Sequence, residues 1–140
     1  MHFVIFGEPK AKGRPRFRNN GRYVQTYTDA TTTNYENLVK LSYLEACGGV
    51  PEILKDEVEV CIIAYFSIPK STSKKMKEAM TSGRILHTKK PDVDNLCKSI
   101  LDGLNGVAYE DDKQVVKLSC MKMYSDEPRV IVSVKRYMYE

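Results

Sequence analysis

The sequence has none of the segments that would carry it into or across a membrane. No apolar run approaches the ~18 residues that a membrane-spanning helix requires. The opening stretch, MHFVIFGEP, lacks the basic start and the small-residue cleavage site of a secretory signal peptide. We therefore expect a cytoplasmic protein without a membrane partner.

Other chemical signatures are missing as well. The four cysteines lie far apart with no C-x-x-C pair, and three fall at positions typical of apolar faces. They predict reduced core residues rather than disulfides or zinc ligands. No glycine-rich nucleotide loop, internal repeat or low-complexity segment occurs. These absences argue against a disulfide scaffold, a zinc site and a repeat architecture.

The charge of the chain is unevenly distributed. The formal total is +4, from 22 basic and 18 acidic residues. The segment from Pro91 to Asp112 holds six acidic residues and one lysine, a net charge of −5, so the remaining 21 basic and 12 acidic residues carry +9. A basic body around an acidic centre suits an enzyme that holds a polyanion and cuts it with a metal. A lysine-rich solvated surface would have the same composition.

Alternating and helical periodicities predict one α+β domain over residues 1–140. Strands are expected at 2–6, 21–27, 58–68, 114–124 and 129–139, and helices at 30–46, 71–82 and 93–107. The strand at 58–68 alternates most clearly, which favours the centre of a sheet. The last two strands are joined through Ser125 to Pro128, which predicts a hairpin. This order of elements predicts a mixed sheet with the helices packed mainly on one face.

The polar chemistry is concentrated between Lys90 and Val116. Apolar residues from Val93 to Val107 recur at intervals of three and four, which predicts a helix with one buried face. Four polar residues then share a sector of roughly 80° on the opposite face. They are Asp94, Lys98, Asp102 and Asn105. The nearby His87 has no second histidine beside it, and a lone histidine is usually structural.

Three further acids flank this helix. Asp92 precedes it directly after Pro91, and Asp111-Asp112 follow it in a loop that can fold back toward it. Structural alternatives exist for each: a helix cap, an i,i+4 pair between Asp94 and Lys98, and a turn before a strand. They do not explain why a basic chain gathers its acids here, since neighbouring carboxylates repel unless a cation lies among them. A divalent metal is the simplest such cation, and all-oxygen donors favour Mg²⁺ or Mn²⁺ over Zn²⁺.

The residues of this segment also form an ordered pattern. It reads KPDVDNLCK at 90–98, LDGLNG at 101–106 and DDKQV at 111–115, about twenty-five residues in all, which is far more specific than a short motif. The pattern closely resembles the signature of the RusA family of Holliday junction resolvases, small phage and bacterial endodeoxyribonucleases. The resemblance implies a RusA-like fold. It also implies that Asp92, Asp94 and Asp112 are metal-binding catalytic residues and that Lys98 is required for activity. In the mechanism that we expect, Asp111 would be an outer member of the metal site.

A basic run follows the first predicted strand. Its cations occupy every second position: Lys10, Lys12, Arg14, Arg16 and Arg18. With glycine and proline between them, they are typical of a loop laid along phosphates, although a merely solvated loop would look the same. Lys74 and Lys75 lie on the expected helix at 71–82, and Lys89 and Lys90 lead directly to Asp92. Together with the resemblance, these residues predict the DNA-binding surface.

The resemblance implies a Mg²⁺-dependent crossover junction endodeoxyribonuclease that acts on four-way junction DNA in recombination and repair. Such a junction has two strands to cut at symmetry-related positions, so one site per chain implies a homodimer. Lys98 would neutralise the phosphate as charge develops in the transition state. Two alternatives stay open. A structure-nonspecific or flap-cutting nuclease would use the same acids, and a non-catalytic DNA-binding protein would keep only the basic body.

Overall fold

The described part of the chain folds around a four-stranded mixed sheet. The computed structural model describes residues 1–13, 16–19, 21, 24–27 and 30–139. The strands are β1 (His2–Phe6), β4 (Val58–Ser67), β5 (Val115–Ser125) and β6 (Arg129–Arg136), in the spatial order β1-β6-β4-β5. β4 runs parallel to β5 and antiparallel to β6, which in turn is antiparallel to β1. The mixed sheet is confirmed, with β4 in its interior as predicted.

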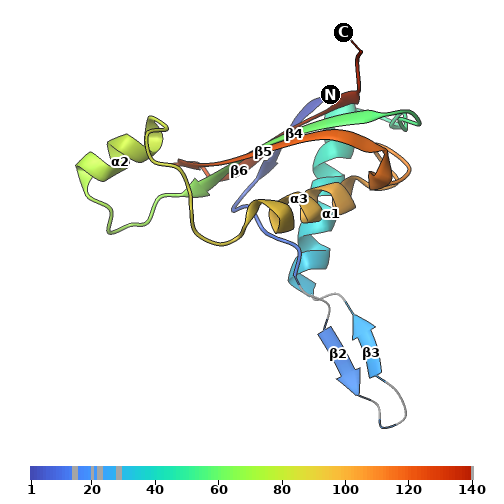
Figure 1. The fold of residues 1–140 in the computed structure, drawn as a ribbon, viewed down its shortest axis with the longest axis horizontal. Helices are drawn as coiled ribbons and strands as arrows, with labels where there is room; N and C mark the ends of the chain where they lie inside the picture. The colour runs from blue at the N-terminus through green and yellow to red at the C-terminus, as the bar shows by residue number, and fades with distance from the viewer. Residues whose placement is uncertain (14–15, 20, 22–23, 28–29, 140) are drawn as a thin grey trace.

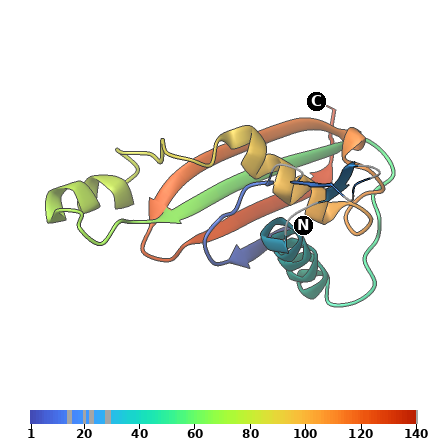
Figure 2. The same cartoon turned by 90° about the horizontal axis from the view of Figure 1, so that it is seen from below.

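One face of this sheet is the core. Alternate residues of β4 are buried on that face, as the period of two in a strand requires. They are Val58, Val60, Ile62, Ala64 and Phe66. The helices α1 (Ala30–Cys47) and α3 (Val93–Leu104) lie against the same face, whereas α2 (Lys74–Thr81) lies beyond one end of the sheet (Figure 1, Figure 2). The α+β class with helices mainly on one face is therefore confirmed.

The two packed helices approach each other closely at Gly103. A Cβ atom at this position would lie 2.7 Å from Cβ of Val39 and 2.9 Å from the carbonyl oxygen of Glu36. Glycine therefore permits a backbone approach that any larger residue would obstruct. This contact brings Glu36 of α1 beside the polar edge of α3, next to Asp102.

The predicted hairpin between the last two strands is wrong. β5 and β6 each pair with β4, which lies between them. The connection of residues 126–128 must therefore span two strand spacings, roughly 10 Å, which three residues can do. A short polar connection predicts that the chain reverses. It does not show whether a third strand, here the strongly apolar β4, lies between the two arms.

The basic run is partly a strand rather than a loop. β2 (Arg16–Asn19) pairs antiparallel with β3 (Val24–Tyr27), which falls within the strand expected at 21–27. Figure 1 shows this two-stranded hairpin projecting away from the body, beyond α1. Cations at every second position have the period of a strand as well as the look of an extended loop. The predicted DNA contact Arg14 lies outside the described residues.

Candidate active site

The candidate site begins at the amino end of α3. The helix forms because Leu96, Ile100 and Leu104 bury one face in the core. Asp92 is its N-cap, with its backbone carbonyl accepting from the amide of Leu96 at 3.1 Å, but its carboxylate makes no capping hydrogen bond. Asp94 follows in the first turn, and both acids are exposed. Their negative charge is favourable there because the helix dipole places partial positive charge at this end.

Lys98 lies one turn further along α3 and joins two acids. Its ammonium is 3.0 Å from Oδ1 of Asp102 and 3.1 Å from Oδ2 of Asp112. The pair with Asp102 is an i,i+4 contact on one helix face, whereas the alternative i,i+4 pair of Lys98 with Asp94 is not among the ion pairs of the described residues. The hydrogen bonds to Asp102 and then to Asp112 raise the pKa of Lys98 above its usual value. The acidic loop thus does fold back onto α3, and Lys98 is its point of contact.

A second lysine extends this chain of charges toward α1. Lys12 Nζ lies 2.6 Å from Oε1 of Glu36 and 3.2 Å from Oδ2 of Asp102. Burial lowers the pKa of Lys12, and the hydrogen bonds to Glu36 and Asp102 outweigh burial, so that the pKa is raised overall. Five side chains of alternating charge therefore run along one edge of α3. In order they are Glu36, Lys12, Asp102, Lys98 and Asp112.

The acidic loop after α3 has a defined internal structure. Asp111 caps a short 3₁₀ helix, η1 (Asp112–Gln114), by accepting from the amide of Lys113 at 3.0 Å. That hydrogen bond, above all, lowers the pKa of Asp111. The carboxylate of Asp111 is thereby engaged with its own loop, which matches the turn alternative for this residue. Asp112 instead points to Lys98.

Gln114 fastens this loop to the rest of the molecule. Its Oε1 accepts from the amides of Glu110 and Asp111 at 2.9 and 3.0 Å. Its Nε2 donates to the carbonyls of Leu54 and Asp56 at 2.9 and 3.0 Å. The full hydrogen-bonding capacity of the amide oxygen and nitrogen is therefore used. We call these four bonds the Gln114 clamp, because they join residues 110–111 to residues 54–56.

Lys122 of β5 holds the segment that leads into Asp92. It pairs in register with the buried Ala64, so it occupies an inward-facing position of its strand. Its ammonium donates to the carbonyls of Lys89 and Pro91, both at 2.7 Å. Two charge-assisted hydrogen bonds thus hold the backbone immediately before α3. The side chains of Lys89 and Lys90 remain exposed beside Asp92.

His87 packs as a core residue next to this segment. Its ring stacks on Phe66 with the centroids 3.8 Å apart and meets the edge of Tyr124 at 5.3 Å. Burial, and then the positive charge of Lys122, lowers the pKa of His87 below its ordinary value of 6.5. This environment agrees with a structural role and gives no reason to make His87 a catalytic base.

These contacts place the acids of residues 92–112 on one helix and one clamped loop. A comparison with known protein families matches residues 7–135 to the model of the family described as Endodeoxyribonuclease RusA. This chain belongs to the RusA endodeoxyribonuclease family. It is also 40% identical over 138 residues to the uncharacterized protein YqaN of Bacillus subtilis (strain 168), covering 96% of this chain and 95% of that protein.

For a RusA-family chain, the acids are only partly gathered. Within the part of the chain that the structure describes, no group of three or more His, Cys, Asp or Glu side chains is placed to hold a metal ion. Asp112 is paired with Lys98, and Asp111 caps its own loop. Asp92 and Asp94 form no ion pair with another described residue. Their carboxylates are hard oxygen donors at an exposed helix start, which suits Mg²⁺ chemically.

The predicted DNA-binding residues are spread widely over the RusA-like body. Arg16 and Arg18 belong to β2 of the projecting hairpin, and Lys74 and Lys75 lie exposed on α2, well away from that hairpin (Figure 1). Lys89 and Lys90 are next to Asp92, and Lys10 is exposed on the segment that leads to the hairpin. Lys12 is turned instead toward Glu36 and Asp102. No helix of the described residues is long and apolar enough to cross a membrane.

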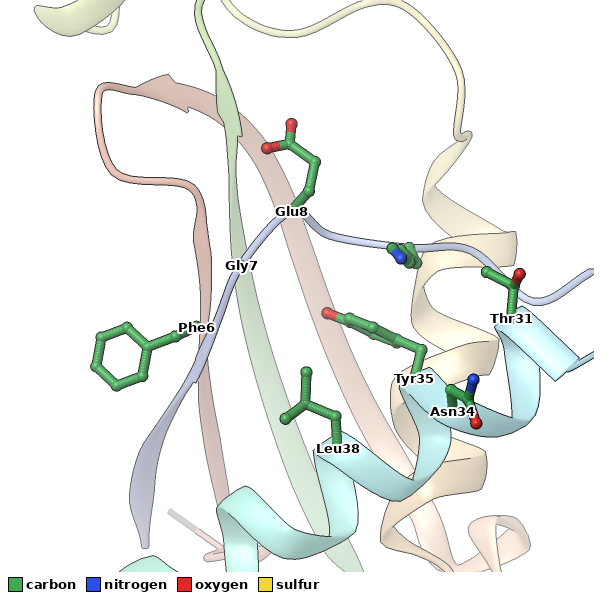
Figure 3. Close-up of a pocket in the computed structure, with 8 residues that line it drawn as sticks. Phe6, Gly7, Glu8, Thr31, Asn34, Tyr35 and Leu38 are labelled. Carbon is green, nitrogen blue, oxygen red and sulfur yellow. The ribbon is translucent and has the colours of Figure 1, made fainter.

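One hollow on the surface is separate from these acids. It measures about 240 Å³ and lies between β1, the segment after it and α1. Figure 3 shows Glu8, Tyr35 and Leu38 around it, and its lining includes none of the acids of residues 92–112. The candidate active site instead begins at two exposed acids, Asp92 and Asp94, at the start of α3.

Two supporting residues were missed by reasoning from the sequence alone. Gln114 lies within the RusA pattern, but the pattern does not show that its amide bridges two distant segments. Lys122 had a local signal, because it stands among Leu118, Cys120 and Tyr124, the alternate residues that share the inward face of β5. A charged residue at such a position needs a polar partner, and backbone carbonyls supply it.

Proposed function

We propose that this protein is a metal-dependent, structure-selective endodeoxyribonuclease that resolves Holliday junctions by paired phosphodiester hydrolysis, with a role in DNA recombination and repair. Membership of the RusA family supports the nuclease activity. The observation that carries the proposal is the arrangement at α3, where Asp92 and Asp94 form no ion pair with any described residue and Lys98 connects their helix to Asp112. The cytoplasmic location stays a prediction, as does the phage or prophage origin that the resemblance to phage and bacterial resolvases implies.

Asp92, Asp94 and Asp112 would hold Mg²⁺ or Mn²⁺, which would supply an activated water and stabilise the leaving oxygen. The carboxylate of Asp111, engaged as a cap, would be at most an outer ligand. Lys98 is half exposed and can reach a phosphate that approaches the amino end of α3. Its ammonium would neutralise charge that grows on the phosphate in the transition state.

The DNA would lie across the helix-bearing side of the molecule. Lys89 and Lys90 border Asp92, and the basic strand β2 projects from the same side as α3 (Figure 1). Exposed lysines and arginines contact phosphates without reading sequence, which suits an enzyme that selects a DNA shape. The net charge of +9 outside the acidic segment favours this binding.

We further propose that the active form is a homodimer. A four-way junction presents two equivalent strands, and a twofold dimer would present two equivalent sites. Mixing wild-type chains with Asp94→Asn chains should then give heterodimers that nick one strand, so cruciform plasmid would accumulate as nicked circles. A monomeric nuclease would show only dilution of its activity.

The metal site is tested by Asp92→Asn, Asp94→Asn and Asp112→Asn. Each should abolish Mg²⁺-dependent cleavage of a four-way junction and leave binding equal or tighter, since a metal ligand and a negative charge near phosphate are removed together. Asp126→Asn is the matched control, because this exposed acid lies in the β5–β6 connection and pairs with Lys77. Cleavage at the wild-type rate by any of the three variants would exclude that residue as a ligand.

Comparison of DNA substrates decides between the proposed resolvase and the alternatives. The wild-type protein should cut four-way junctions in preference to flaps and linear duplex of the same sequence. Equal cutting of all three substrates would show that the protein is a structure-nonspecific nuclease that uses the same acids. Tight binding without metal-dependent cutting of any of them would identify a DNA-binding protein that has lost catalysis.

A further inference from the structure

The segment that leads to the projecting hairpin is fastened along α3. We call residues 10–13 the strap. The carbonyl of Lys10 accepts from the hydroxyl of Ser99 at 2.7 Å, and the amide of Lys12 donates to the carbonyl of Asn95 at 3.0 Å. The amide of Gly13 donates to the hydroxyl of Thr32 on α1 at 2.8 Å. The backbone of the strap is thus held against both helices, and this fixes where the side chain of Lys12 starts.

The ammonium of Lys12 is directed inward. Its side chain is 25% exposed, and its two partners Glu36 and Asp102 are 22% and 16% exposed, whereas the Lys98 side chain is 54% exposed. Two of the three donor directions of Lys12 are taken by these carboxylates. A lysine held in this way is poorly placed to contact a phosphate, whereas Lys10 of the same run is exposed.

Asp102 divides its two oxygens between the two lysines. Oδ2 accepts from Lys12, and Oδ1 accepts from Lys98. Lys12 therefore fixes the orientation in which Asp102 meets Lys98. The other partner of Lys98 is Asp112, a proposed active-site carboxylate on a separate loop, so Asp102 is the anchor of Lys98 that lies outside the proposed ligand set.

We propose that Lys12 is a positioning residue, which acts through Asp102 to hold Lys98 where it meets the scissile phosphate. This inference rests on the proposed nuclease function and on the role given there to Lys98. Without Lys12, Asp102 would lose one of its two partners and would be left near the unpaired carboxylate of Glu36. Asp102 would then turn, and Lys98 would lose its fixed position. Small displacements of a catalytic group can cost about 10²-fold in rate.

The test compares Lys12→Met with Lys10→Met, a matched change two residues away on the same strap. Lys12→Met should lower the single-turnover cleavage rate at saturating junction by about 10-fold or more, with Kd within about 2-fold of wild type. Lys10→Met should instead raise Kd and reduce the slope of log Kd against log salt by up to ~0.9. The inference is overturned if Lys12→Met shows the binding pattern of Lys10→Met and keeps the wild-type cleavage rate.

Two further variants separate positioning from stability. Lys12→Arg keeps the charge and should restore much of the rate. The double variant Lys12→Met/Glu36→Gln removes the carboxylate that Lys12→Met leaves unpaired, so it should fold even where the single variant does not. Its cleavage rate should stay low because Asp102 still lacks its partner. A return to the wild-type rate would show that Lys12 serves only to neutralise Glu36.

A readout that does not depend on cleavage keeps this inference apart from the proposed function. In protein with ¹³C-labelled lysine, Lys12→Met should shift the ε-methylene signal of Lys98, assigned with Lys98→Arg, whereas Lys10→Met should not. If wild-type protein cuts no DNA, the proposed function fails. The Lys98 signal then tests by itself whether Lys12 acts on Lys98 through Asp102. If wild-type protein cuts junctions and Lys12→Met changes neither the rate nor this signal, only the role of Lys12 is refuted.

Discussion

The Gln114 clamp allows a direct test of how the acidic loop is held in place. We expect Gln114→Met to destabilise the protein and to slow cleavage. Methionine has a similar length but can form none of the four hydrogen bonds of the amide. These bonds tie residues 110–111 to residues 54–56, so the substitution would release the loop that carries Asp112.

The size of the effect follows from where the four bonds lie. A net contribution of ~0.5–1.5 kcal/mol per hydrogen bond would give about 2–6 kcal/mol in total. Three of the four bonds lie in exposed surroundings, where water can replace the lost partner. We therefore expect the lower end, a loss of about 2 kcal/mol in the free energy of unfolding. For a chain of this size that corresponds to a fall in Tm of about 7 °C.

Urea unfolding measures the stability, and single-turnover cleavage of a four-way junction measures the effect on the site. A loop displaced by 1 Å could lower the rate about 10²-fold. Gln114→Glu is the matched control: it keeps the shape and the acceptor, but places a negative charge against the carbonyls of Leu54 and Asp56. It should destabilise at least as much as Gln114→Met. Wild-type stability together with a wild-type rate in Gln114→Met would refute the role of the clamp.

Two other residues give independent predictions. Lys122→Met should lower the cleavage rate and leave the fold intact by circular dichroism, because the carbonyls of Lys89 and Pro91 lose their donor; an unchanged rate would show that this anchor is dispensable. The wild-type protein should lose part of its unfolding free energy at acid pH because of His87, and His87→Phe should remove this loss. The folded-state pKa of His87 lies below 6.5, so the unfolded chain takes up the proton first. Its contribution to stability is therefore full above pH 6.5 and declines as the pH falls toward the folded pKa. Unfolding free energies at pH 7.5 and 5 should differ less in His87→Phe than in wild type, and an equal difference would contradict the assignment.

The elements with strong periodicity could be predicted from the sequence because each buries one face. β4 alternates without interruption, and α3 has apolar residues at intervals of three and four, so both formed within a few residues of the expected bounds. Strand neighbours could not be predicted in the same way. The connection of residues 126–128 is compatible with a direct hairpin and with a crossing over the end of β4, and only the packing of the whole sheet decides between them.

The contacts of the site also fall into two groups: those that local sequence spacing predicts and those that depend on the packing of distant segments. The pair Lys98–Asp102 is a local consequence of helical spacing, which the sequence predicts by placing both residues on one face of the helix. Lys12 and Glu36 are 24 residues apart, and both are far in sequence from Asp102. Their meeting depends on the close approach of α1 and α3 at Gly103 and on the strap along α3. The alternating cations of the basic run do not reveal that the side chain of Lys12 faces other residues of the protein.

Lysines balance part of the acidic segment, and this changes where a metal is needed. The sequence predicts a divalent cation from the like-charge repulsion among six acids, but Lys98 pairs with Asp112 and Asp102, and Lys12 pairs with Asp102 and Glu36, which offsets part of that repulsion. Glu110 pairs with Lys55. Among the described residues, Asp92 and Asp94 form no ion pair, although Lys89 and Lys90 lie nearby in sequence and the helix dipole adds a partial positive charge. These two acids are the starting point of the proposed site. Asp112 meets Lys98 through Oδ2 alone, so its other oxygen could join the proposed site while Asp102 keeps Lys98 in place.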